Sequence, residues 1–495
     1  MAILLGIDLG TSSVKTMLAH SNGSIVGVEK ADYDVMIPQV GYAEQCAEGW
    51  WMSLIDALKR LREKHPEEYS EIECIGFSGQ MHGLVVIDDK QQEIRPSIIW
   101  LDQRSKKQVS EIEMQLGLDF VKEVLHNRAS TGFALPSLLW LQEHEPENFS
   151  RVHSVISPKD YIRMKMIGRV ACEYSDASAT LMLDVKNRKW AQELLEKLNL
   201  PTHIFPELYS STEIAGGITA ECAELTGLLE GTPVVYGCGD QMAQSLGNGN
   251  ISEGSVTSNI GTGGQISAYS NEDKYDPELR LNSFCHAVNN AYTIFGATLC
   301  AGMSLAWLKN EILKIDDYDT VFELAKEVEP GSGGLIFLPY LAGERTPHMD
   351  ADAKGLFFGL ALGQDRGNLI RAVLEGVLFS LKDSMELLEG LGIPCDTVIA
   401  SGGGAQNPVW LQMQADIFDK EITVSNVQEQ ACLGACILAG IGAGIFDDCT
   451  HACTEMVSFS TVVYRPQRDV VDKYNEAYST YKELYMQTSH LMKAK

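Results

Sequence analysis

The sequence lacks the long hydrophobic runs of a membrane protein. No window approaches about 18 uninterrupted apolar residues, which is the length that a membrane-spanning helix needs. The first residues reach Gly6 and Asp8 without a positively charged leader, which argues against secretion. We therefore expect a cytoplasmic protein with no membrane partner.

Basic charge is also scarce. The chain carries 39 Lys and Arg residues against 67 Asp and Glu residues, and its formal net charge is -28. Such a chain repels nucleic acid unless it has a local basic patch. The longest basic cluster, Lys106-Lys107 after Arg104, is followed by Glu111 and Glu113 and reads as a mixed helical surface. We expect no nucleic-acid partner.

The twelve cysteines are dispersed, with no disulfide framework apparent in their spacing. Cys432, Cys436, Cys449 and Cys453 form two C-x3-C pairs, and four thiolates could hold zinc, although structural zinc sites usually use C-x2-C. The first pair lies in the apolar stretch 431–445, where thiols four residues apart commonly pack in a core. We expect core packing and keep zinc as the alternative.

Alternating strand and helix patterns predict an α/β protein. At 495 residues, with 45% of them apolar, the chain has room for more than one packed unit. Asn22-Gly23 lies between two apolar runs and predicts a hairpin, so the chain opens with antiparallel strands. Apolar periodicity predicts helices over 50–62 and 369–391. Strands are expected at 3–9, 14–19, 25–28, 72–77, 233–236, 335–338 and 397–400.

Two short strings recur in the same order in the two halves of the chain. Residues 9–13 (LGTSS) resemble residues 260–264 (IGTGG), and residues 76–79 (GFSG) resemble residues 399–402 (IASG). Short strings match by chance, but the shared order favours two lobes of similar architecture. Clustered glycines place the boundary between the lobes near residues 250–253.

The common phosphate-binding motifs are absent: no P-loop and no G-x-G-x-x-G fingerprint follows a strand. Glycine turns do occur at residues 10–13, 261–264 and 402–404. Two Gly-Thr turns that end strands could direct backbone N–H groups and hydroxyls at phosphate oxygens from opposite lobes. The alternative is that they are ordinary hairpin turns.

Two carboxylates stand at strand ends. Asp8 precedes the first Gly-Thr turn, where it could hold Mg²⁺ beside phosphates or simply cap the turn. Asp240 follows the strand 233–236 in the string Gly-Cys-Gly-Asp-Gln. It could accept a proton from a substrate hydroxyl, or it could be the N-cap of the helix that starts at Gln241.

Two further segments carry side chains that suit a sugar. Residues 78–83 offer the amide of Gln80, the thioether of Met81 and the imidazole of His82. Residues 100–104 add an aromatic face and a cation that could reach polyol hydroxyls, from Trp100 and Arg104. The alternatives are a structural histidine in the first segment, and a buried tryptophan beside a surface ion pair in the second.

With these motifs in view, the chain resembles the FGGY family of carbohydrate kinases, and within it the members that phosphorylate xylulose. The matching segments are 6–12, 78–83, 239–240, 337–348 and 401–407, together with Trp410. The resemblance implies two actin-like, ribonuclease-H-like lobes around a central cleft. It places the sugar-binding and catalytic lobe at residues 1–250 and the nucleotide-binding lobe at residues 251–495.

The resemblance also implies roles for residues. Asp240 is similar to the family's catalytic base, and Asp8 to its carboxylate on the Mg²⁺ side. The sugar-binding residues would be Gln80, Met81, His82, Trp100, Asp102, Arg104 and Gln241. The ATP-binding residues would be Thr11, Ser12, Ser13, Lys15, Gly261, Thr262, Gly263, Gly403, Gly404 and Asn407.

The expected reaction is therefore transfer of the γ-phosphoryl group of ATP to a primary hydroxyl of a pentulose, D-xylulose first. The alternatives are a kinase for another ketose or polyol, and a sugar-sensing protein that does not phosphorylate. Departures from the family pattern at Leu101, Ser137 and Gly263 bear on sugar preference and on the second phosphate turn. The partners would be the sugar and ATP, and a homodimer is left open.

Overall fold

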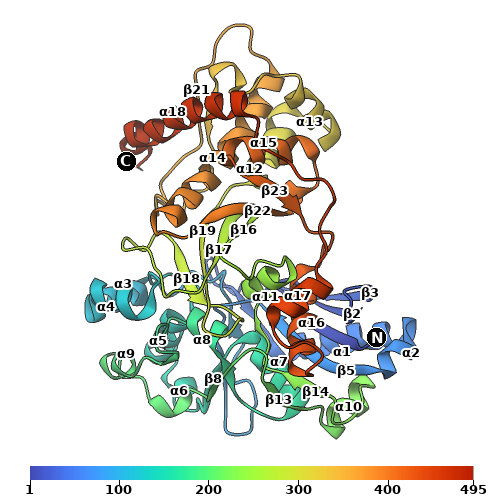
Figure 1. The fold of residues 1–495 in the computed structure, drawn as a ribbon. Helices are drawn as coiled ribbons and strands as arrows, with labels where there is room; N and C mark the ends of the chain where they lie inside the picture. Colours follow the sequence, from blue (N-terminus) through green and yellow to red (C-terminus); the bar gives the residue numbers. More distant parts are fainter. Residues whose placement is uncertain (494–495) are drawn as a thin grey trace.

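The computed structural model describes residues 1–493, which form two lobes, each built on a large sheet (Figure 1). The sheet of the lower lobe in Figure 1 comes from the first half of the chain. Its path is β13 (Ile214–Gly217), β14 (Pro233–Val235), β5 (Ile72–Gly79), β1 (Ile3–Leu9), β2 (Ser13–His20) and β3 (Ile25–Asp32), with β15 (Cys238–Gly239) also pairing with β5.

Five strands of the upper sheet repeat the order and direction of five strands in the lower one, whereas β13 and the sixth upper strand lie at opposite edges. The path of the upper sheet is β18 (Asn282–Cys285), β19 (Tyr292–Thr298), β17 (Gly264–Ser270), β16 (Gly254–Ile260), β22 (Cys395–Gly402) and β23 (Glu421–Val424). In both sheets the first strand pairs antiparallel with the second, across a Gly-Thr turn, and parallel with a later strand. The predicted pair of similar lobes is confirmed.

The matching registers place the two recurrent strings at equivalent points. Asp8 lies opposite Ser78 on the parallel neighbour, and Asn259 lies opposite Ser401 in the second sheet. Because the carboxyl ends of parallel strands meet at one edge, each Gly-Thr turn lies beside the end of β5 or β22. The repeated strings are therefore the corresponding turn and strand end of the two lobes.

Most predicted elements are present, with bounds that differ from the predicted ones by a few residues. The predicted helices are α1 (Ala47–Lys64) and α14 (Arg366–Gly390), and Gly23, with φ of +81°, lies in the turn between β2 and β3. A capping box at Asp365 fixes the start of α14. The strand expected at 335–338 is β20 (Ile336–Leu338), but it pairs only with β21 (Leu356–Phe358), outside the large sheets.

One late helix, α16 (Gln430–Gly442), returns to the lower lobe and packs on the first sheet (Figure 1). A Cβ atom at Gly6 would lie 2.2 Å from the carbonyl oxygen of Cys432, and one at Gly76 would lie 1.9 Å from that of Ala435. The helix can approach β1 and β5 this closely because both positions are glycine.

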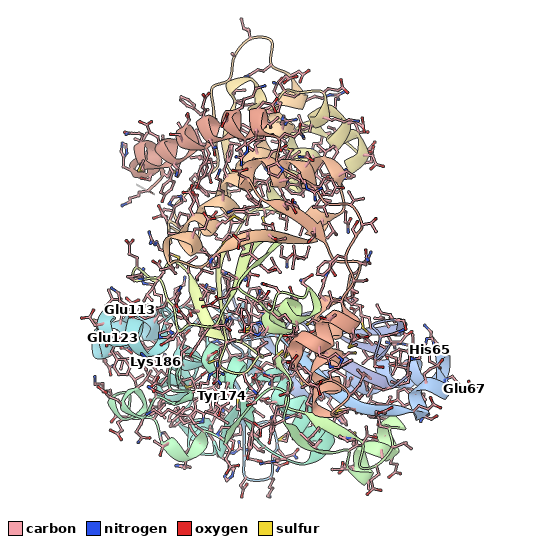
Figure 2. All side chains as sticks on the ribbon, in the orientation of Figure 1. His65, Glu67, Glu113, Glu123, Tyr174 and Lys186 are labelled. Atoms are coloured by element: carbon pink, nitrogen blue, oxygen red, sulfur yellow. The ribbon has the colours of Figure 1, made fainter. Side chains whose placement is uncertain are left out.

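The sheets divide near residue 250, but α16 and the following α17 (Cys449–Met456) lie with the lower lobe. The last helix, α18 (Arg468–Met492), packs in the core of the upper lobe (Figure 1). Side chains fill the interior of both lobes (Figure 2). The division of the chain at residue 250 stays a prediction, and residues 430–456 are the segment that a single boundary does not describe.

The cysteine pairs belong to the core. Cys432 and Cys436 on α16 and Cys449 and Cys453 on α17 are buried in one hydrophobic cluster that also contains Leu4. Among residues 1–493, no group of three or more histidine, cysteine, aspartate or glutamate side chains is arranged to hold a metal ion. This arrangement favours the core-packing interpretation over zinc.

The longest helices are α14 and α18, with 25 residues each. Helix α14 is buried on every side over residues 370–381 in the core of the upper lobe, whereas α18 is amphipathic and buries one face there. In the part of the chain that the structure describes, no helix is both long enough and apolar enough to cross a membrane.

Candidate active site

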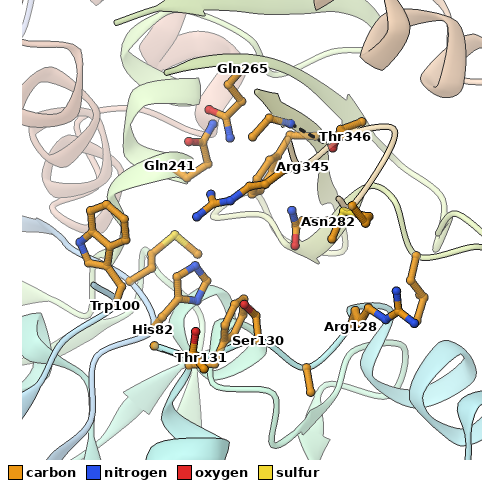
Figure 3. A pocket seen from close by; sticks show the side chains of 18 of the residues that line it. His82, Trp100, Arg128, Ser130, Thr131, Gln241, Gln265, Asn282, Arg345 and Thr346 are labelled. Atoms are coloured by element: carbon orange, nitrogen blue, oxygen red, sulfur yellow. Dashed lines mark hydrogen bonds between the residues drawn. The ribbon is translucent and has the colours of Figure 1, made fainter. Parts of the chain in front are cut away.

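A cavity of about 340 Å³ lies between the two lobes (Figure 3). The lower lobe contributes the predicted residues Met81, His82, Trp100, Asp240 and Gln241 to its lining. The second half of the chain contributes residues that include Gln265, Asn282, Ala297, Arg345 and Thr346. Five of the predicted catalytic and sugar-binding residues, from three distant segments, therefore meet in one cavity.

Asp240 is the first residue of α11 (Asp240–Gly247). The N-cap position of this helix is Gly239, and no side chain caps it, so the alternative that Asp240 is the N-cap is wrong. Burial, reinforced by the charges of Asp8 and Asp176, raises the pKa of Asp240 to about 8, against a smaller lowering effect of the Gln241 backbone N–H. A carboxyl group with this pKa is matched to proton transfer near neutral pH.

Asp8 lies at the end of β1. Burial raises the pKa of its carboxyl group, and a hydrogen bond from Ser78 and the charge of Lys15 partly offset that effect. The Ser78 hydroxyl donates to Oδ1 of Asp8 at 2.7 Å. The other carboxylate oxygen of Asp8 accepts no protein hydrogen bond among the described residues. This oxygen is therefore free to bind a hard cation, whose remaining ligands would be phosphate oxygens and water.

His82 has the positive φ of +71° and is held in one tautomer. Its Nδ1 lies 2.8 Å from the carbonyl oxygen of Ala179, and because a carbonyl only accepts, Nδ1 carries the proton. Burial lowers the pKa of His82 to about 4, so the ring is neutral at pH 7. The ring packs on Phe133, with the ring centroids 4.0 Å apart, and Nε2 remains as an acceptor at the cavity.

Replacing this acceptor should weaken sugar binding selectively. We expect His82→Ala to raise the KM for the sugar by about 10- to 100-fold, the cost of losing one buried hydrogen bond, while the KM for ATP changes little. Steady-state kinetics with each substrate varied in turn measures both constants. His203→Ala, at an exposed position, is the control. Equal increases in both KM values would contradict a sugar-side role.

The alternative interpretation of this segment, a buried tryptophan beside a surface ion pair, is wrong, because the tryptophan is exposed and the ion pair is buried. Trp100 is 37% exposed at the cavity, and its Nε1 donates to Oγ1 of Thr11 at 2.9 Å. The side chains of Asp102 and Arg104 are buried. Arg104 Nε lies 2.9 Å from Asp102 Oδ2, and a terminal nitrogen of Arg104 lies 2.6 Å from Glu44 Oε1. The tryptophan faces the cavity, and the ion pair holds its loop.

Gln80 also lies behind the cavity rather than in its lining. Its side chain is buried, and its Nε2 donates to Oε1 of Gln45 at 2.9 Å. The Gln45 Nε2 donates in turn to the carbonyl oxygen of Thr11 at 2.7 Å. In this arrangement Gln80, like Asp102 and Arg104, supports the site from behind without reaching the cavity.

The two Gly-Thr turns are closed by different backbone hydrogen bonds, but both leave N–H groups free. The N–H of Gly10 donates to the carbonyl of Ser13 at 3.0 Å, and the N–H of Gly261 donates to that of Gly263 at 2.9 Å. The next two N–H groups of each turn, at positions 11 and 12 and at positions 262 and 263, donate to no acceptor within residues 1–493. Free N–H groups in a tight turn form an anion-binding nest, which fits the phosphate-clamp prediction.

A second cavity, of about 560 Å³, adjoins the upper turn. Its lining includes Gly261, Thr262, Gly403, Gly404 and Asn407 from the predicted ATP-binding set. The lining also includes the apolar and aromatic side chains of Met303, Leu305, Tyr318, Phe322 and Trp410. A polar glycine-rich wall facing an apolar one suits a nucleotide, whose phosphates are anionic and whose base is flat and apolar.

Besides Thr11, the side chains of Asn407 and Lys15 in the predicted ATP-binding set also have protein partners. Asn407 is the N-cap of α15 (Pro408–Phe418), and its Oδ1 accepts from the Val409 N–H at 2.9 Å. Lys15 forms an ion pair with Glu429, with Nζ 2.5 Å from Oε2, and lies opposite Asp8 on β2. Lys15 is therefore near the phosphate side of the site, but its charge is shared with Glu429.

Sequence reasoning missed the residues that the upper lobe contributes to the sugar-side cavity. Gln265, Asn282 and Arg345 line it, and none was assigned a role. Arg345 lies in segment 337–348, which contributed to the family resemblance, but no residue of that segment was assigned a role. Gln265 follows the second Gly-Thr turn directly, and a polar residue at that position was the available signal.

The two similar sheets, the cleft cavity and the paired phosphate turns define the actin-like ATPase fold. Family models for the N-terminal and C-terminal domains of the FGGY family of carbohydrate kinases match residues 3–247 and 256–443. The chain belongs to this family and is an ATP-dependent carbohydrate kinase. The alternative of a sugar sensor without kinase activity is not supported.

Full-length relatives agree with this assignment. The chain is 39% identical to a xylulose kinase from Lactococcus lactis, over 99% of this chain and 98% of the relative. It is 33% identical to a gluconokinase from Bacillus subtilis, over 95% and 93%. The crystal structure of a xyloylose kinase from Brucella ovis superposes with a TM-score of 0.93 at 33% identity and covers 99% of this chain and 100% of that one.

Proposed function

We propose that the protein phosphorylates the primary hydroxyl of D-xylulose, with ATP as donor and Mg²⁺ as the metal, in the cytoplasm. The observation that carries this proposal is the cavity that both Asp240, with its raised pKa, and the neutral acceptor His82 line, together with the two turns that have free backbone N–H groups. The xylulose kinases among the full-length relatives support the choice of sugar.

In this reaction Asp240 takes the proton of the attacking hydroxyl, and His82 and Gln241 hold the sugar. The free N–H groups of the two turns donate to phosphate oxygens from opposite sides of the cleft, and they stabilise the charge that spreads over the transferring group. Mg²⁺ would neutralise phosphate charge, and Asp8 would hold it. Ser78 fixes the orientation of the Asp8 carboxylate for that purpose.

A coupled assay of ADP release over a panel of sugars tests the proposal. The panel contains D-xylulose, L-xylulose, D-ribulose, L-ribulose, glycerol and D-gluconate. We expect the highest kcat/KM with D-xylulose, because differential contacts in the transition state commonly separate such sugars by about tenfold or more. A higher kcat/KM for glycerol or gluconate would contradict the assignment.

One observation favours D-gluconate as a second candidate. Arg345 places a positive charge in the cavity, and a cation there could bind the carboxylate of a sugar acid. The gluconokinase relative is consistent with this reading. The same assay separates the two candidates, because a site built for a carboxylate would discriminate strongly against a neutral pentulose.

A further inference from the structure

Arg345 is an arginine in the sugar-side cavity without a carboxylate partner. Two other arginines line the same cavity, and each pairs with a carboxylate. Arg128 pairs with Glu113, which Figure 2 labels at the edge of the lower lobe, and Arg280 pairs with Asp276. Over residues 1–493 the Arg345 guanidinium makes no ion pair or hydrogen bond. In a chain with 67 acidic residues, an arginine left unpaired in a cleft is available to a ligand.

The adjacent carboxylate cannot pair with this guanidinium because other donors occupy it. Glu344 is 3% exposed, and its oxygens accept from the Thr298 and Ser380 hydroxyls and from the backbone N–H groups of Leu299 and Arg345. These four hydrogen bonds turn the Glu344 side chain into the upper lobe and fix the backbone of its neighbour. The Arg345 side chain consequently leaves the loop on the other side, towards the cleft.

The loop that carries Arg345 is held against the upper sheet. The N–H of Thr346 donates to the carbonyl of Ala297 on β19 at 3.1 Å, and its hydroxyl donates to the carbonyl of Arg280 at 2.7 Å. Figure 3 shows the guanidinium extending into the cavity between Gln241 and His82, which belong to the lower lobe. A rigid support of this kind reduces the entropy that is lost when the side chain binds a ligand.

His82 and Arg345 offer complementary groups across the cleft. The free Nε2 of His82 accepts a hydrogen bond, whereas the guanidinium presents only donors, in a planar fork. The charge of Arg345 also contributes to lowering the pKa of His82, which keeps that acceptor neutral. A hydroxyl-rich ligand can donate to one group and accept from the other.

We propose that Arg345 contacts the sugar and determines specificity: it donates to two neighbouring oxygens of the ketose from the upper lobe, opposite His82. This inference rests on the proposed function for the identity of the sugar. Because Arg345 and His82 belong to different lobes, a sugar bound by both also links the lobes. The assignment is to the sugar rather than to ATP, since Arg345 lines the sugar-side cavity and not the second cavity.

Arg345→Gln tests the proposal. We expect the KM for D-xylulose to rise by about 30- to 100-fold, the effect of losing a charged hydrogen-bond pair, with the KM for ATP within about threefold of wild type. Titration calorimetry of D-xylulose without nucleotide should show the same loss of affinity. Arg345→Lys keeps the positive charge but lacks the planar fork of donors, so its KM for D-xylulose should lie between those of wild type and Arg345→Gln. Arg468→Gln, at an exposed position of the upper lobe, is the control.

Three outcomes would overturn the proposal. A fall in kcat with an unchanged KM and unchanged sugar affinity would mean that Arg345 acts on the transferring phosphoryl group. Wild-type constants in Arg345→Gln would mean that the side chain stays in solvent. A melting temperature well below that of Arg468→Gln, with the loss of affinity for both substrates, would mean a structural role. Failure of the proposed function is separate, because wild-type enzyme would then not turn over D-xylulose.

Discussion

Asp240→Asn should lower kcat by about two to four powers of ten, the range that removal of a general base produces. The side chain keeps its size, so nucleotide binding should stay nearly intact. Single-turnover and steady-state assays with D-xylulose measure the loss, and fluorescence titration of ATP measures the retained binding. Asp472→Asn, at an exposed position of α18, is the matched control and should behave as wild type. Near wild-type turnover in Asp240→Asn would contradict the assignment of the base.

The same variant should be more stable than wild type, and increasingly so as the pH rises. The carboxyl pKa of Asp240 is about 8 in the folded protein against its ordinary value of 3.8, so unfolding releases a proton between these pH values. The free energy of unfolding of the wild type therefore falls as the pH rises from about 4 to about 8. Asparagine does not titrate, so the variant does not lose this stability. We expect a higher melting temperature for Asp240→Asn, with a larger gain at pH 8 than at pH 5.

Lys159→Met should destabilise the protein by about 3–5 kcal/mol, a large part of the 5–15 kcal/mol that is typical of a domain. Lys159 is completely buried on α7 (Pro158–Ile167), and its Nζ lies 2.8 Å from Asp160, 3.4 Å from Glu173 and 3.1 Å from Asp176. Arg163 is the other buried cation in contact with Asp160. Without Lys159, Arg163 is the one cation left beside the three buried carboxylates, so negative charge is buried without compensation. Burying uncompensated charge lowers the free energy of unfolding. Urea denaturation measures the change.

Lys165→Met provides the control, because Lys165 lies on the same helix with a partly exposed ion pair to Glu48 and should cost little. A second variant distinguishes charge from packing. Adding Asp176→Asn to Lys159→Met removes one of the uncompensated carboxylates and should restore part of the stability. If the double variant is as unstable as Lys159→Met, then lost packing rather than unpaired charge causes the effect.

The local elements of this fold could be predicted because short-range chemistry specifies them. Residues 10–13 and 261–264 form turns since glycine and small polar side chains favour them, and the shared order of the strings 9–13, 76–79, 260–264 and 399–402 indicated the two lobes. Apolar periodicity indicated the helices α1 and α14 in the same way. Helix α16 was missed as a part of the lower lobe, because only the close approach of Gly6 and Gly76 reveals where it packs.

The residue types of the site could be inferred from motifs, but their environments could not. The sequence was enough to select Asp240, His82 and the Gly-Thr turns, because these motifs are local and contiguous. Only the tertiary structure decided that the side chains of Asp102 and Arg104 are buried behind the cavity, that Trp100 faces it, and that Arg345 reaches it from the other lobe without a partner. The reason is physical: burial, pairing and pKa depend on groups that are distant in the chain and meet only when the two lobes pack together.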